Sequence, residues 1–172
     1  MGEIIVVSGP PGVGKSTAAE AVADLYDPSV LVVGDAFFSF LRRGHVEPWL
    51  PEADEQNRTV VAAAAAACGR LAEGYTVVYD GVLWPPYAAL FAAECGAAFH
   101  YVLLLPPLEV TLGRVRARSD HPFADVAAAT DMWHSFEATR GSLPVIEALA
   151  PTGEVAHEIV RLVEAGTIRT GG

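Results

Sequence analysis

The sequence has 172 residues, of which 52% are hydrophobic and 19% charged, a composition that suits one globular domain and excludes a disordered chain. Its formal net charge of −10 argues against a nucleic-acid backbone as the partner. Cys68 and Cys95 have neither zinc-ligand spacing nor a disulfide pattern, which indicates reduced thiols in a cytoplasmic protein. We therefore expect residues 1–172 to form a single domain with no signal peptide and no membrane span; the oligomeric state stays open.

An apolar strand, a glycine-rich loop and an Ala-rich helix are predicted over the first 25 residues. The strand covers about residues 3–8 and the helix about 15–25. Between them, the sequence fits the pattern G-x-x-x-x-G-K-[ST] at every fixed position. Backbone N–H groups of such a loop converge on phosphate, Lys15 would reach the β- and γ-phosphates of ATP, and Ser16 would ligate Mg²⁺. The predicted nucleotide-binding residues of this loop are Gly9, Pro10, Pro11, Gly12, Val13, Gly14, Lys15, Ser16 and Thr17.

The second predicted strand, residues 30–33, leads into an acidic residue and an aromatic segment. A short helix is expected over residues 36–43 and a loop over 44–51. We interpret Asp35 as the catalytic base, with helix capping as the structural alternative. Phe38, Arg42 and Trp49 are predicted to contact the acceptor, the two aromatic side chains as an apolar wall.

A long helix over residues 52–73, a third strand over 75–79, a helix over 86–95 and a fourth strand over 99–105 follow. The third strand ends at Asp80. Because ligands bind outside the carboxyl ends of parallel strands, we expect Asp80 to lie close to Asp35 and the phosphate loop. Asp80 is interpreted as a magnesium-side carboxylate that also borders the acceptor, and capping is again the alternative.

The last third of the chain carries a cluster of arginines in an otherwise acidic sequence. A helix that begins at the Pro106-Pro107 pair and ends near Arg118 places Arg114 and Arg118 on one face, before a turn at residues 119–122. We interpret these two arginines as a phosphate clamp that closes over ATP; an interaction of each with the helix dipole is the alternative. A helix over residues 125–140, a fifth strand over 144–149, a helix over 152–165 and a frayed end over 167–172 complete the prediction.

Over its whole length the chain resembles small P-loop kinases of the shikimate kinase, gluconate kinase and chloramphenicol phosphotransferase type. The segments that carry the resemblance are GPPGVGKST at 9–17, VVGDAFF at 32–38, VVYDGV at 77–82, LLPPLEVTLGRVRAR at 104–118 and PVIEALAPTGEVAHEIVRLVE at 144–164. The resemblance implies an α/β fold with a five-stranded parallel sheet of order 2-3-1-4-5, helices on both faces and a lid over the nucleotide.

The same resemblance implies roles for several side chains. Asp35 matches the acidic residue that activates the acceptor hydroxyl, Arg114 and Arg118 match phosphate-binding arginines, and Pro151 with Thr152 matches the segment that lines adenine. Shikimate kinases carry D-x-D at the end of the second strand, whereas this chain has Val33-Gly34-Asp35. The missing first acid favours the gluconate kinase and chloramphenicol phosphotransferase side.

The sequence therefore predicts an ATP- and Mg²⁺-dependent phosphotransferase that acts on a hydroxyl of a small molecule, with Asp35, Lys15 and Arg118 as catalytic residues and Ser16 and Asp80 as metal ligands. Aromatic residues after Asp35 favour an acceptor with an apolar side, such as an antibiotic or another natural product. A sugar-acid or nucleoside kinase, and a regulatory module that binds ATP without transferring phosphate, are the alternatives. The sequence does not determine the acceptor or the preference between ATP and GTP.

Overall fold

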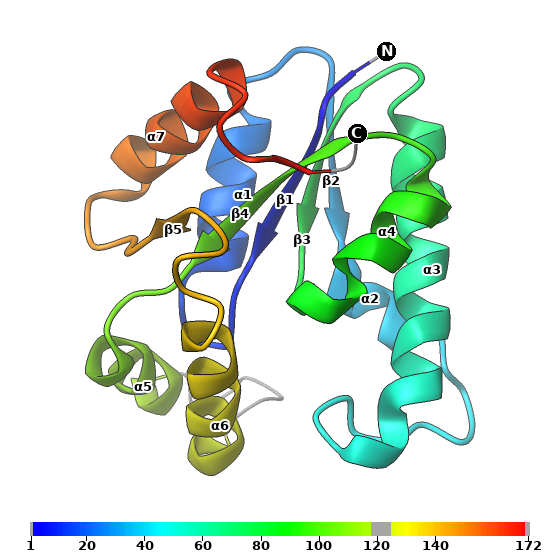
Figure 1. The fold of residues 1–172 in the computed structure, drawn as a ribbon, viewed down its shortest axis with the longest axis vertical. Coiled ribbons are helices and arrows are strands. Elements are labelled where there is room, and N and C mark those ends of the chain that lie inside the picture. Colours follow the sequence, from blue (N-terminus) through cyan, green and yellow to red (C-terminus); the bar gives the residue numbers. More distant parts are fainter. Residues whose placement is uncertain (1, 118–124, 171–172) are drawn as a thin grey trace.

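A parallel sheet with strand order β2-β3-β1-β4-β5 lies at the centre of the computed structural model, which describes residues 2–117 and 125–170 (Figure 1). The strands are β1 (Ile4–Ser8), β2 (Ser29–Val33), β3 (Thr76–Asp80), β4 (Phe99–Leu104) and β5 (Val145–Ile146). The predicted order 2-3-1-4-5 is confirmed. Val7 of β1 pairs with Asp80 of β3, so the carboxyl ends of these strands lie at one edge of the sheet, the lower edge in Figure 1.

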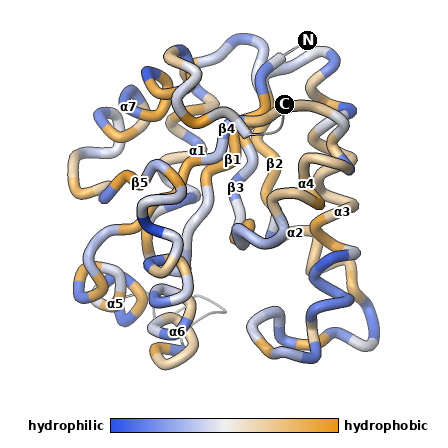
Figure 2. Tube along the Cα trace, in the orientation of Figure 1, coloured by the Kyte–Doolittle hydropathy of each residue, from blue (hydrophilic) through white to orange (hydrophobic). Residues whose placement is uncertain are grey.

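Helices cover both faces of the sheet because the central strands are apolar on both sides. On one face, α1 (Lys15–Ala23) and α7 (Thr152–Glu164) pack against alternate residues that include Ile5 and Val7. On the other face, α3 (Asp54–Leu71) and α4 (Ala88–Cys95) pack against the residues in between, Ile4 and Val6. Figure 1 shows these two helix pairs on opposite sides, and Figure 2 shows that the sheet between them is apolar while the first turns of α3 are hydrophilic.

The remaining helices lie around the carboxyl ends of the strands: α2 (Gly34–Phe38), the 3₁₀ turns η1 (Pro51–Ala53) and η2 (Pro85–Tyr87), α5 (Leu108–Ala117) and α6 (Val126–Glu137). A last short strand, β6 (Arg169–Thr170), lies at the opposite edge, beside the first residues of β4. Among the described residues, no helix combines the length and apolar composition needed to cross a membrane. Arg118 and the turn predicted at 119–122 lie outside the described residues.

Three boundary predictions are wrong for identifiable reasons. The helix expected over residues 36–43 is α2, which ends at Phe38, after which single turn bonds such as Ser39 N–H to Ala36 O replace the helical pattern. The fifth strand covers only Val145–Ile146, because the chain turns at Ala148, where φ is 48°. Within the end expected to fray, residues 167–172, Arg169 and Thr170 instead form β6, which pairs antiparallel to β4 and follows the buried Ile168; residues 171–172 lie outside the described residues.

Candidate active site

The loop between β1 and α1 has the conformation that its glycines make possible. Gly9 and Gly12 have φ values of 146° and 84°, which L-residues with a side chain rarely adopt. A Cβ atom on Gly9 would lie 2.3 Å from the carbonyl oxygen of Leu104, and one on Gly12 would lie 2.7 Å from Val115 Cγ2. Gly12 therefore allows α5 to pack directly against the loop.

Three predicted site residues, Lys15, Ser16 and Asp80, lie together where this loop enters α1. Lys15 Nζ donates a hydrogen bond to Pro10 O at 3.0 Å, so the amine lies across the loop. Asp80 is only 5% exposed, and its burial raises the pKa of the carboxyl, while a hydrogen bond from Ser16 and the charge of Lys15 act to lower that pKa. The Ser16 hydroxyl and the Asp80 carboxylate are therefore direct neighbours.

These two oxygen-bearing side chains fit Mg²⁺, which prefers oxygen ligands and takes several of them from phosphates and water. Among the described residues, no cluster of three His, Cys, Asp or Glu side chains could hold a metal ion. A magnesium ion at Ser16 and Asp80 would thus complete its coordination with phosphate oxygens and water.

A cavity of about 600 Å³ joins the phosphate loop to the segment between α2 and α3. Lys15, Ser16 and Asp35 line it, as do the predicted acceptor residues Phe38 and Trp49. Pro11, Gly12 and Gly14 of the phosphate loop line it as well, so the structure brings eight of the predicted site residues to one cavity. Further lining residues that the sequence analysis did not propose are His45, Glu47, Asn57, Trp84, Tyr87 and Met132.

The other predicted acceptor residues are placed differently. Arg42 is exposed and does not line this cavity. Asp80 is buried next to Ser16 and does not line this cavity.

Arg114 connects two loops on the nucleotide side. Its Nη1 donates to Val13 O at 3.0 Å and its Nη2 donates to Ala148 O at 3.3 Å. Next to it lies a smaller cavity of about 180 Å³, which Gly14, Arg114 and Thr152 line. This is the place that the resemblance implies for adenine. Pro151 precedes α7 and is exposed, and it does not line this cavity.

The segment that carries Trp49 is fixed by two amide side chains at the start of α3. Gln56 Oε1 accepts from Val46 N–H at 2.8 Å, and Gln56 Nε2 donates to Val46 O at 2.7 Å. Asn57 Nδ2 donates to Pro48 O at 2.7 Å. These three hydrogen bonds hold residues 46–48, so Glu47 and Trp49 have defined positions beside the cavity. No motif in the sequence indicates this arrangement.

Trp84 is fixed through its neighbour Leu83. Ser8 Oγ donates to Leu83 O and accepts from Leu83 N–H, both at 3.0 Å, and the Tyr101 hydroxyl also donates to Leu83 O. The Trp84 ring stacks on Phe136 of α6, with ring centres 6.0 Å apart and an interplanar angle of 19°. The run Trp84-Pro85-Pro86-Tyr87, which begins four residues after the end of the third strand, is a sequence feature that could have indicated this aromatic wall.

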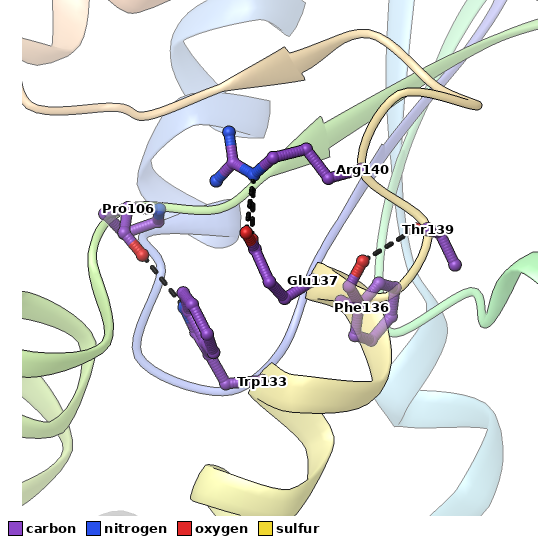
Figure 3. Close-up of polar contacts among 6 residues, drawn as sticks. All are labelled: Pro106, Trp133, Phe136, Glu137, Thr139 and Arg140. Atoms are coloured by element: carbon purple, nitrogen blue, oxygen red, sulfur yellow. Dashed lines mark hydrogen bonds and ion pairs between the residues drawn. The ribbon is translucent and has the colours of Figure 1, made fainter.

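One side-chain hydrogen bond joins α6 to a neighbouring segment, and two others lie at the end of α6 itself (Figure 3). Trp133 Nε1 donates to Pro106 O at 2.9 Å, which ties α6 to the segment between β4 and α5. Thr139 Oγ1 donates to Phe136 O at 2.7 Å. Arg140 Nε pairs with both Glu137 carboxylate oxygens at 2.8 Å, so its partner is in its own segment.

Comparisons with known proteins agree with this fold. A family model described as AAA domain matches residues 4–141. No curated protein matches the chain. The structure is similar to that of a tunicamycin resistance protein from Deinococcus radiodurans (23% identity, TM-score 0.68), and the match covers 100% of both chains.

Two kinase structures are also similar. A gluconokinase from Sinorhizobium meliloti 1021 has 22% identity and a TM-score of 0.73, and the match covers 96% of this chain and 95% of that one. A shikimate kinase from Acinetobacter baumannii, determined with shikimate, has 17% identity and a TM-score of 0.67, and the match covers 98% of this chain and 96% of that one. At these identities, the structural similarity shows a shared fold and nothing more.

Proposed function

The chain belongs to the AAA domain family of P-loop kinases, and from that membership we propose that it transfers the γ-phosphoryl group of ATP to a hydroxyl of a small molecule. One observation supports this most directly: Lys15 and Ser16 of the phosphate loop line the same cavity as the Asp35 carboxylate. A phosphate group and an acceptor hydroxyl can thus meet in one cavity, as transfer between them requires.

Each of these residues has a proposed task. Lys15 balances negative charge on the β- and γ-phosphates, while Ser16 and Asp80 hold Mg²⁺, which supplies further charge neutralisation when bound. Asp35 accepts the proton of the hydroxyl while the acceptor oxygen bonds to the γ-phosphorus and the bond from that phosphorus to ADP breaks. Arg118, outside the described residues, is proposed to stabilise the transferring group. Because ATP is the donor, we place the reaction in the cytoplasm.

For the acceptor, we propose an antibiotic or another natural product with an apolar side. The support is the number of aromatic side chains in the cavity, Phe38, Trp49, Trp84 and Tyr87. One of the similar structures is that of a tunicamycin resistance protein.

ADP release tests the proposed function. The purified protein is incubated with ATP, Mg²⁺ and single candidates from a panel of antibiotics, sugars, sugar acids and nucleosides, and each hit is examined for a product heavier by one phosphoryl group. We expect at least one acceptor to accelerate ADP release and Lys15→Ala to abolish the reaction. Release of phosphate to water alone, with no acceptor that accelerates it, would favour the regulatory module. Transfer by Lys15→Ala at the wild-type rate would contradict the proposed role of the phosphate loop.

A further inference from the structure

Negative charge predominates among the side chains that line the acceptor part of the cavity. Glu47 and Asp35 are exposed carboxylates there, and His45 is the one histidine among the described lining residues. Of the described lining residues, Lys15 alone is a lysine or arginine, and it belongs to the phosphate loop. The nearby Arg42 and Arg58 are exposed and do not line the cavity. An acceptor with a carboxylate would therefore approach like charge and would find no arginine among these residues.

Asn57 independently indicates that the ligand carries a hydrogen-bond donor. This residue lines the cavity and is only 9% exposed. Its Nδ2 donates to Pro48 O, which can only accept, so the orientation of the amide is fixed. Its Oδ1 is buried and accepts no hydrogen bond from a described residue. A buried acceptor of this kind is costly until a donor reaches it, and an N–H or O–H group of a ligand is such a donor whereas a carboxylate is not.

The aromatic walls of the cavity are held rigidly. Trp84 stacks on the buried Phe136, and the Tyr87 hydroxyl donates to Asp54 Oδ1 at 2.7 Å. Fixed aromatic faces pack well against a ring, and they also attract cations. The volume of about 600 Å³ is in the range of pockets that hold drug-sized ligands.

We propose that the acceptor is an alcohol built on an apolar ring, neutral or cationic, with an N–H or second O–H donor that Asn57 Oδ1 receives. Glu47 selects this class against sugar acids and other carboxylates. This inference rests on the proposed function, because it describes the acceptor of that same site.

Three benzyl alcohols that differ only in one group test the inference: 4-(hydroxymethyl)benzylamine, 4-(hydroxymethyl)benzamide and 4-(hydroxymethyl)benzoate. Their binding to the full chain is measured by ligand-observed NMR titration without ATP, so that the result does not depend on phosphate transfer. We expect the amine and the amide to bind about tenfold more tightly than the benzoate, since a like charge opposes the latter. Glu47→Gln should reduce this preference, whereas Glu52→Gln, an exposed carboxylate in the same segment that does not line the cavity, should keep it.

Asn57→Leu distinguishes recognition from a purely structural role. If Asn57 Oδ1 receives the ligand donor, this variant weakens binding of the amine and amide more than that of the benzoate. An equal loss for all three would show that Asn57 only holds residues 46–48 and would overturn its part in the proposal. Benzoate binding as tight as benzamide binding, or no binding of any of the three, would overturn the proposed acceptor class. Selective binding of the amine and amide without any phosphorylated product in the presence of ATP would instead contradict the proposed kinase activity.

Discussion

Replacing Arg114 with Met tests whether this side chain joins the two loops on the nucleotide side. Arg114 donates to Val13 O in the phosphate loop and to Ala148 O in the segment that follows β5. Met has an unbranched apolar stem but no donors, so Arg114→Met removes both hydrogen bonds while it keeps much of the packing. The two loops border the smaller cavity and would then move independently.

The expected magnitude follows from the geometry of the two bonds. A hydrogen bond from a charged donor contributes roughly 1.5–3 kcal/mol to stability. Arg114 is only partly buried and one of its bonds is long, at 3.3 Å, so water screens and replaces part of this contribution. We therefore expect the free energy of unfolding to fall by about 1–2 kcal/mol. If ordering the two loops again costs about the same free energy when ATP binds, the Kd for ATP should rise about tenfold.

Urea denaturation and titration with ATP measure these two quantities. Arg116→Met is the matched control, since Arg116 is exposed on the same helix and an exposed substitution changes stability by about 0.5 kcal/mol or less. Equal effects of the two substitutions on stability and ATP affinity would refute the assigned role of Arg114. Arg114→Lys should lie between wild type and Arg114→Met, because a lysine keeps the charge but cannot span both carbonyls with a planar fork.

Three other substitutions address single atoms of the site. Asp35→Asn should reduce the rate of phosphate transfer about a hundredfold or more with nearly unchanged ATP affinity. Steady-state kinetics and ATP titration measure these two quantities. A loss of ATP affinity with an unchanged transfer rate would contradict the role of Asp35 as the base. Burial raises the pKa of the Asp80 carboxyl above its usual 3.8, so the folded protein resists its ionisation. The free energy of unfolding of wild type should therefore fall relative to that of Asp80→Asn as the pH rises above that value. Urea denaturation at about pH 4 and about pH 7 measures this difference, and a difference that does not change with pH would contradict the prediction. Ser8→Ala should lower the free energy of unfolding by about 0.5–1.5 kcal/mol, because Leu83 N–H then keeps only its bond to Gly81 O and Leu83 O only that from the Tyr101 hydroxyl. Equal urea midpoints for the two proteins would contradict this role of Ser8.

The parts of the fold that local sequence determines were predictable. The phosphate loop is recognisable because glycines, a lysine and a hydroxyl residue occur at fixed spacing between an apolar strand and a helix. The strand order was available only through the resemblance to known kinases. The strand β6 was not predictable, because residues 169–170 have no strand pattern of their own and pair with β4 from a distance of about 70 residues along the chain.

The cavity residues likewise fall into those that local sequence predicts and those that only the folded structure brings together. Lys15 and Asp35 follow directly from a motif or from the end of a strand, where side chains at the carboxyl edge of a parallel sheet are expected to meet. Trp84 owes its position to hydrogen bonds between Ser8 and Leu83, which are 75 residues apart. Tyr87 likewise bonds to Asp54 across 33 residues. Such pairings depend on the folded structure, so a pattern along the chain does not reveal them.

The two ends of the cavity therefore differ in what a substitution would change. At the phosphate end, a Cβ atom on Gly12 would meet both Val115 Cγ2 and Thr111 O, so altering this loop also disturbs the packing of α5. At the acceptor end, Gln56 and Asn57 hold residues 46–48 from the first turns of α3, while later residues of α3 pack in the core against the sheet. The acceptor segment can thus change without altering the sheet. This separation makes the segment from His45 to Trp49 the part of this chain in which we expect substitutions to alter the preference for the proposed acceptor with little effect on stability.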